Sequence, residues 1–123
     1  YFGYEFANQG GKLPDDVIKY YVSLVSNPDS LRGSLGWYRA FDATLTQNAQ
    51  RGATPLTMPV LAIGGELSYG SHVGDAMKPL ANDVQGVVIP GAGHWVAEEA
   101  PEAMLAALTT FLAPYRVAAV ATS

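Results

Sequence analysis

The first half of the chain carries apolar residues at helical spacing. Between Pro14 and Asn27 they recur every three to four positions, which predicts a helix whose first turn holds the proline. A second series predicts a helix from about Ser30 to Ala49, although two glycines inside it each weaken the helix by about 1 kcal/mol relative to alanine. Paired glycines predict a loop over residues 8–12.

The apolar pattern changes after residues 50–59, a stretch rich in proline and threonine that predicts a linker. Residues 60–63 form an unbroken apolar run closed by paired glycines, and residues 86–90 repeat this pattern. Such runs are typical of strands buried on both faces of a parallel sheet. A helical stretch at 73–80 connects the two strands, and a last amphipathic helix is expected over residues 101–113.

This order of elements predicts an α/β fold. Two parallel strands do not form a stable sheet alone, because such sheets need several strands and cover on both faces. We therefore expect the chain to be the C-terminal portion of a larger α/β domain, comprising its last two parallel strands and their flanking helices. The tail over residues 117–123 is expected to be frayed.

Composition narrows the function classes. The 123 residues carry a net charge of -4 and no cluster of basic residues, which argues against nucleic acid as a partner. The sequence has no cysteine, which excludes disulfides and thiolate chemistry, and no apolar run approaches the ~20 residues of a membrane span. The two histidines have no carboxylates at ligand spacing, so we expect neither a metal site nor a cofactor.

A histidine follows the second predicted strand. Residues 90–95 read Pro-Gly-Ala-Gly-His-Trp, so His94 lies just beyond the carboxyl end of a buried strand, where open α/β sheets bind their ligands. The two glycines let the backbone turn and present the ring. Imidazole exchanges protons near neutral pH, which suits a general base. We predict that His94 is catalytic; the alternative is a loop histidine with only a local hydrogen bond.

Other polar residues near this turn have simpler interpretations. His72 lies at a predicted helix start and is expected to be a solvated surface residue. Glu98 and Glu99 lie near the start of the last helix, where negative charge complements the helix dipole, and this role is preferred to catalysis.

Three parts of the sequence together resemble the C-terminal part of epoxide hydrolases and of the related haloalkane and haloacid dehalogenases. They are residues 58–66, the Gly-His-Trp turn with the acidic segment up to residue 101, and Leu-Arg at 31–32 leading to Trp-Tyr-Arg-Ala-Phe at 37–41. The histidine turn is common to many α/β-hydrolases. The Tyr-Arg-Ala-Phe segment, at its distance from that turn, is typical of the epoxide hydrolase branch.

The resemblance covers about residues 28–114 and implies a division of the chain within the α/β-hydrolase fold. Residues 1–50 would be the C-terminal part of a helical cap, or lid. Residues 51–59 would be a linker, residues 60–114 the C-terminal part of the hydrolase core, and residues 115–123 a tail.

The resemblance also implies roles for individual residues. His94 matches the base that activates water against a covalent ester intermediate. Tyr38 matches a cap tyrosine that donates a hydrogen bond to the epoxide oxygen, which is chemically sensible because a phenol stays protonated at neutral pH. Glu66 is a candidate for the acid that orients the histidine. The family's acid lies about two positions further on, where this chain has Ser68, so the acid could instead come from an earlier strand.

Each aromatic candidate also has a packing alternative. Trp95 and Trp37 could line the substrate pocket, but large aromatic side chains usually pack in a core. On a helix, Trp37 points about 100° away from Tyr38, so the two cannot face the substrate equally. Tyr38 could itself be a packed aromatic residue of the cap.

The sequence contains neither a Gly-x-Ser-x-Gly elbow nor an aspartate equivalent, so the nucleophile is expected outside this chain. The implied partner is the N-terminal portion of the same enzyme, on the same or a separate chain, and the implied substrate is a small, neutral, apolar epoxide. The chain alone is expected to be inactive and poorly soluble. Homo-oligomerisation stays open, and a soluble, cytoplasmic location is the slight expectation.

Three alternatives to an epoxide hydrolase stay open. A haloalkane or haloacid dehalogenase would use the same aspartate and histidine but bind a departing halide. An esterase would carry serine at the missing elbow. A non-catalytic α/β binding module would use the Gly-His-Trp segment only as a turn, but it would expose unpaired sheet edges.

Overall fold

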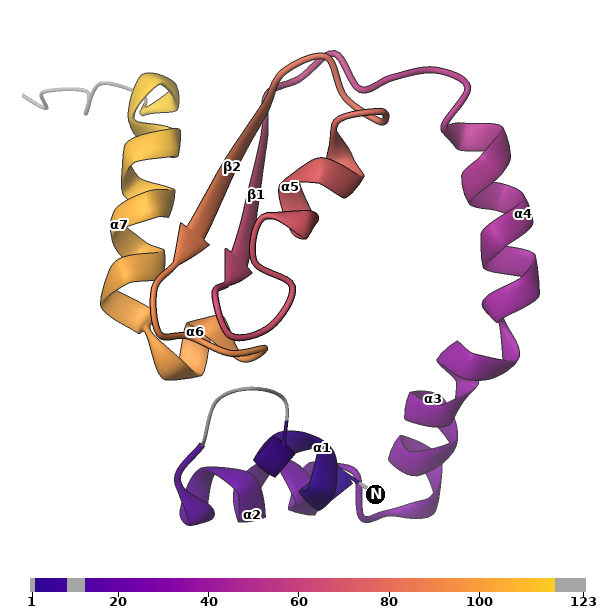
Figure 1. Cartoon of the computed structure of the whole chain (residues 1–123). Coiled ribbons are helices and arrows are strands. Elements are labelled where there is room, and N and C mark those ends of the chain that lie inside the picture. Colours follow the sequence, from indigo (N-terminus) through magenta and orange to yellow (C-terminus); the bar gives the residue numbers. More distant parts are fainter. Residues whose placement is uncertain (1, 9–12, 117–123) are drawn as a thin grey trace, which may run out of the picture.

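The computed structural model describes residues 2–8 and 13–116 (Figure 1). Its elements, in chain order, are α1 (Phe2–Asn8), α2 (Asp15–Leu24), α3 (Pro28–Arg39), α4 (Phe41–Arg51), β1 (Val60–Gly65), α5 (His72–Met77), β2 (Val84–Ile89), α6 (Val96–Glu99), α7 (Pro101–Leu112) and the 3-10 helix η1 (Ala113–Tyr115). Most of the loop predicted over residues 8–12, and residues 117–123 of the predicted tail, lie outside the described residues.

The two strands pair in parallel, as the two apolar runs predicted. Val60 lies opposite Val84, and Gly65 lies opposite Ile89, so both strands end at the same edge of the sheet. Helices α5 and α7 both contact the strands, and Figure 1 shows them on opposite sides of the sheet. This arrangement confirms the α/β class and gives the two strands cover on both faces.

The helical region before the strands differs from the prediction. The single helix expected over residues 30–49 is wrong: two helices, α3 and α4, meet at Ala40, whose backbone has φ -86° and ψ 1°. Arg39 ends α3 and Asp42 lies in the first turn of α4, so each helix end meets a charge that complements its dipole. Helix α1 was not predicted from the sequence.

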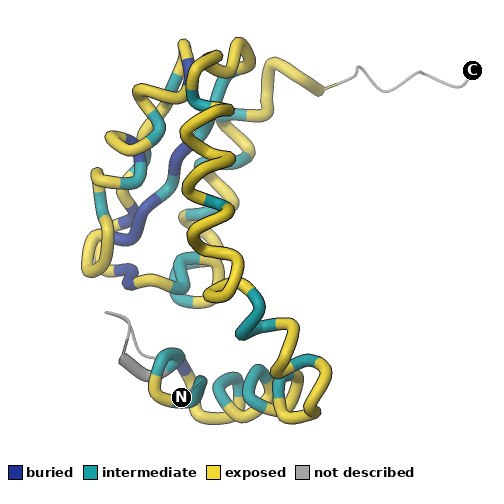
Figure 2. The backbone as a smooth tube through the Cα atoms, turned by 90° about the vertical axis from the view of Figure 1, so that its right-hand side faces the viewer, coloured by how far each residue is buried: buried dark blue, intermediate teal, exposed yellow. Residues whose placement is uncertain are grey.

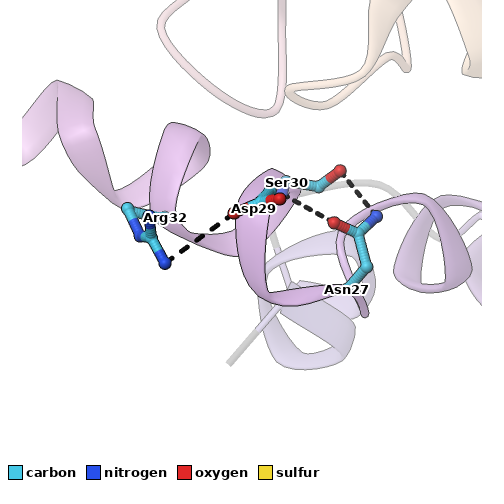
Figure 3. A network of polar contacts seen from close by, with 4 residues as sticks. All are labelled: Asn27, Asp29, Ser30 and Arg32. Atoms are coloured by element: carbon cyan, nitrogen blue, oxygen red, sulfur yellow. Dashed lines mark hydrogen bonds and ion pairs between the residues drawn. The ribbon is translucent and has the colours of Figure 1, made fainter.

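The start of α3 is fixed by local polar contacts (Figure 3). The Asn27 side chain accepts a hydrogen bond from the backbone N–H of Ser30 at 2.9 Å and donates one to the Ser30 hydroxyl at 2.8 Å. Pro28 occupies the first turn, where its missing N–H costs nothing. Asp29 and Arg32 form an exposed ion pair at 3.7 Å. Helix α3, which carries Tyr38, therefore begins at a well-capped residue.

The core of the described residues is small. Its buried apolar residues are Leu13, Ala62, Ala81, Ile89 and Ala92. Figure 2 shows buried positions along the strands, whereas the outer helices are mostly exposed or half-buried. Trp37 on α3 is 80% exposed, and Phe41 and Leu45 on α4 are also exposed. Apolar surface of this extent is typical of an interface. No helix in the described part of the chain is both long and apolar enough to cross a membrane.

Candidate active site

His94 follows β2 at the edge of the sheet where both strands end. Backbone hydrogen bonds connect this loop to the residues after β1: Glu66 N–H donates to the Ile89 carbonyl at 3.0 Å, and Leu67 N–H donates to the Ala92 carbonyl at 2.9 Å. The segment before His94 is therefore an ordered extension of the sheet, at the edge where α/β folds bind ligands.

Gly65 lets the His94 loop pack directly against the end of β1. A Cβ atom built on Gly65 would lie 1.9 Å from the Gly93 carbonyl oxygen and 2.6 Å from that of Ala92. No side chain fits there without moving the loop. Gly91, with φ +70°, adopts a left-handed conformation that favours glycine at the turn out of β2.

Glu66 lies at the same edge, next to the His94 loop. Its carboxylate accepts a hydrogen bond from the backbone N–H of Gly91 at 2.8 Å. Within the described residues, the hydrogen bond found for this carboxylate is therefore to the loop backbone, three residues before His94, and not to the imidazole. The predicted role of Glu66 as the orienting acid stays a prediction.

Glu99 holds the other side of the loop. One carboxylate oxygen accepts from the Gly93 N–H at 2.7 Å and the other from the Trp95 N–H at 2.9 Å, so the carboxylate bonds to the amides on both sides of His94. The sequence interpretation missed this contact: it placed the start of the last helix at residue 101, as observed, but assigned Glu99 to that helix's dipole and did not predict the short helix α6 that holds it. A glutamate shortly after a turn can bond back to the turn's amides, and this was the available signal.

An open cavity of about 420 Å³ adjoins the His94 ring. Its walls include Phe6, Tyr21, Trp95 and Met104, which makes the space next to the imidazole largely apolar. Trp95 forms two ring contacts with centroid separations of 4.8 Å, an edge contact with His94 and a tilted contact with Phe6. Trp95 therefore both lines the cavity and packs against α1.

A polar contact accompanies these rings. The Tyr21 hydroxyl on α2 donates a hydrogen bond to the Glu98 carboxylate on α6, and the Phe6 ring stacks on Tyr21 at 5.4 Å. The hydrogen bond to Glu98 raises the pKa of Tyr21 above its ordinary 10.0, and desolvation and the Glu98 charge act in the same direction. Helices α1 and α2 thus contact the segment that follows His94.

This contact predicts a stability difference that depends on pH. Because folding raises the pKa of Tyr21, the neutral phenol stabilises the fold fully below pH 10, and this contribution is lost as pH rises through the raised value. We expect Tyr21→Phe to lower the free energy of unfolding at pH 8 and to have less effect at strongly alkaline pH. Denaturant titrations across this range measure the difference. Tyr20→Phe is the matched control, and an equal effect of the two variants at every pH would contradict the assignment.

Of the other residues that the sequence analysis considered, only some lie beside the His94 loop. Tyr38 and Trp37 are exposed on α3, which Figure 1 shows set apart from the His94 loop. Ser68 lines a second cavity of about 150 Å³, whose wall also includes His94. His72 is exposed on the first turn of α5, as expected. Within residues 2–8 and 13–116, no three histidine, aspartate or glutamate side chains gather closely enough to hold a metal ion.

Sequence comparison connects the chain to known enzymes. It is 32% identical over 102 residues to the soluble epoxide hydrolase of Corynebacterium sp. (strain C12), covering 83% of this chain and 35% of that protein. It is 33% identical over 84 residues to epoxide hydrolase A of Mycobacterium tuberculosis (strain ATCC 25618 / H37Rv), covering 65% of this chain and 26% of that protein. The chain thus spans about a third or less of these relatives' length. No protein-family model matches the sequence.

Solved structures share the fold. Cfl2 from Burkholderia cenocepacia superimposes with a TM-score of 0.82 at 24% identity, over 90% of this chain and 39% of that one. The ligand-free epoxide hydrolase CorEH superimposes with a TM-score of 0.76 at 32% identity, over 84% of this chain and 36% of that one. These matches confirm the fold class and the resemblance found in the sequence. Over most of its length the chain is similar to epoxide hydrolases, and it corresponds to a part of the α/β-hydrolase fold.

Proposed function

We propose that the chain is part of an enzyme that opens epoxides to vicinal diols, with His94 as its general base. The observation that carries this proposal is the position of His94, at the carboxyl end of β2 and on the wall of an apolar cavity. A neutral, apolar epoxide suits such a cavity. The identity of 32% with a soluble epoxide hydrolase over 102 residues supports the same reaction.

The site is completed by parts of the fold that this chain lacks. In our proposal, residues 1–50 belong to the cap, 51–59 to a linker, 60–114 to the hydrolase core and 115–123 to a tail. The remaining strands lie on the same polypeptide or on a partner chain and supply an aspartate nucleophile. The exposed apolar residues of α3 and α4, and the open edges of a two-stranded sheet, support such a partner. Below, the complete enzyme means this chain together with those strands.

The proposed reaction has two steps. The aspartate carboxylate attacks an epoxide carbon, a C–O bond of the ring breaks, and Tyr38 donates its phenolic proton toward the departing oxygen. His94 then takes a proton from water, and the hydroxide attacks the ester carbonyl. Cleavage of the ester releases the diol and regenerates the aspartate, and His94 gives its proton to the medium while the Tyr38 phenolate takes one up, which restores both residues.

The histidine needs an acid to orient it. Glu66 could supply this carboxylate, and the hydrogen bond that it accepts from the Gly91 N–H, in the loop before His94, supports this candidate. The alternative source is a carboxylate on one of the remaining strands, because Ser68 stands where the family's acid is expected. Ser68 and His94 line the same second cavity, so a carboxylate entering it from another strand would lie next to the histidine.

Tyr38→Phe tests whether the reaction is epoxide opening. Because the variant removes one donor to the developing alkoxide, we expect turnover of styrene oxide by the complete enzyme to fall on the order of 10²-fold. Tyr115→Phe, at an exposed position of η1, is the matched control and should leave turnover unchanged. Full activity of Tyr38→Phe would contradict the donor role. Turnover of a chloroalkane in place of styrene oxide would indicate a dehalogenase.

A further inference from the structure

We infer that Glu99 is a positioning residue for His94. Its two carboxylate oxygens accept hydrogen bonds from the amides of Gly93 and Trp95, at 2.7 and 2.9 Å, and His94 is the one residue between them. A carboxylate that accepts from two N–H groups forms charge-assisted bonds, which are about twice as strong as neutral ones. This inference rests on the proposed function, because it gives Glu99 a role only if His94 is the base.

The contact is more than a helix cap. Trp95 is the N-cap residue of α6, and its carbonyl accepts from the Glu99 N–H at 2.9 Å while its own N–H donates to the Glu99 side chain. Trp95 and Glu99 are therefore joined in both directions, by an ordinary helical backbone bond and by a side-chain bond to the N-cap amide that resembles one half of a capping box. The second bond, from Gly93, lies beyond the helix and is not needed to cap it. It fixes the backbone on the strand side of His94.

The two adjacent glutamates of α6 have different partners. Glu99 is half-buried and bonds to the His94 loop, whereas Glu98 is exposed and accepts from Tyr21 on α2. Partial burial limits competition by water and strengthens the Glu99 bonds. Together with the bond from Gly91 to Glu66, these contacts hold the backbone on both sides of His94.

The rate of a catalysed step depends strongly on where the catalytic base lies. A displacement of 1 Å can lower that rate about 10²-fold. The proposed chemistry uses His94 in hydrolysis of the ester and not in its formation. A residue that acts through His94 should therefore affect the second step alone. Glutamine at position 99 keeps the shape but offers one acceptor oxygen to two N–H donors, so it loses one of the bonds.

The test measures the two steps separately in the complete enzyme. After rapid mixing with styrene oxide, we expect Glu99→Gln to slow hydrolysis of the ester at least 10-fold while the rate of ester formation changes less than 2-fold. Glu99→Asp keeps both oxygens and the charge and should recover part of the rate. Glu102→Gln removes the same charge from an exposed position in the first turn of α7 and should resemble the wild type. Equal slowing of both steps, or no slowing, would overturn the positioning role.

A second readout separates this inference from the proposed function. Hydrogen exchange of the backbone amides of Gly93 and Trp95 requires no substrate. Faster exchange at both amides in Glu99→Gln, but not in Glu102→Gln, supports the contact, and unchanged exchange overturns it. Absence of epoxide turnover by the wild-type enzyme would refute the proposed function, while the exchange experiment would still decide whether Glu99 holds the loop.

Discussion

Replacing His94 by glutamine should lower the turnover of styrene oxide by the complete enzyme by about 10²- to 10⁴-fold, the usual contribution of a general base. Glutamine has a similar size and can still form hydrogen bonds, but it cannot take the proton from water. Because only hydrolysis of the ester slows, kcat and KM should fall together, while kcat/KM, which reports formation of the ester, should change little. Steady-state kinetics on the purified variant measure both constants.

The matched control for this variant is His72→Gln. His72 is exposed at the first residue of α5, so the same substitution there should leave both constants unchanged. If His94→Gln retained wild-type turnover, His94 would be the loop histidine of the alternative interpretation. Equal losses in the two variants would indicate a general effect on folding.

Gly65→Ala should destabilise the protein and disturb the site together. The new methyl group would lie 1.9 Å from the Gly93 oxygen, a backbone atom that can move only with the His94 loop. Forcing extra volume into a packed site typically costs about 1–3 kcal/mol, and the close backbone contact predicts the upper end of that range. Denaturant unfolding measures the free energy, and turnover of styrene oxide measures the displacement of the loop.

Gly33→Ala provides the comparison. Gly33 lies inside α3 with no atom within 4 Å of its added Cβ, so alanine there should stabilise the protein by about 0.5–1 kcal/mol through its helix propensity. A Gly65→Ala variant as stable and active as the wild type would show that the loop does not depend on this close packing.

The sequence was sufficient to predict the strands and the position of His94, because these follow from local patterns. The run at residues 60–63 and its repeat at 86–90 identify buried strands without reference to any other part of the chain. A histidine that follows such a strand must lie at the ligand-binding edge of the sheet. Parallel pairing of β1 and β2 then brings the loops after both strands together.

The walls of the candidate site could not be predicted in the same way. Tyr21 and Glu98 are 77 positions apart, and no local pattern indicates that they are bonded. The contact of Phe6 with Trp95 depends likewise on how α1 meets α6. The break between α3 and α4 contains neither glycine nor proline, so only the charges of Arg39 and Asp42 indicated it.

The glutamates show why residue type alone is insufficient. The sequence places three glutamates just after a strand or just after His94, namely Glu66, Glu98 and Glu99. In the structure each has a different partner. Glu66 accepts from the Gly91 amide, Glu98 from the Tyr21 hydroxyl, and Glu99 from the two amides that flank His94. Which carboxylate bonds to which group depends on where α6 ends and α7 begins. The sequence predicted the start of the last helix at residue 101, as observed, but it did not predict the short helix α6 that holds Glu98 and Glu99.

The most direct test of the central claim is the intact mass of the complete His94→Gln enzyme after it is mixed with styrene oxide. In this account, His94 activates the water that hydrolyses an ester formed by a nucleophile elsewhere. The variant should therefore gain the mass of one substrate molecule. Peptide mapping should locate this added mass on a carboxylate outside residues 1–123. The wild-type enzyme should return to its original mass. An unmodified variant that no longer consumes the epoxide, or an adduct on a residue within this chain, would contradict the account.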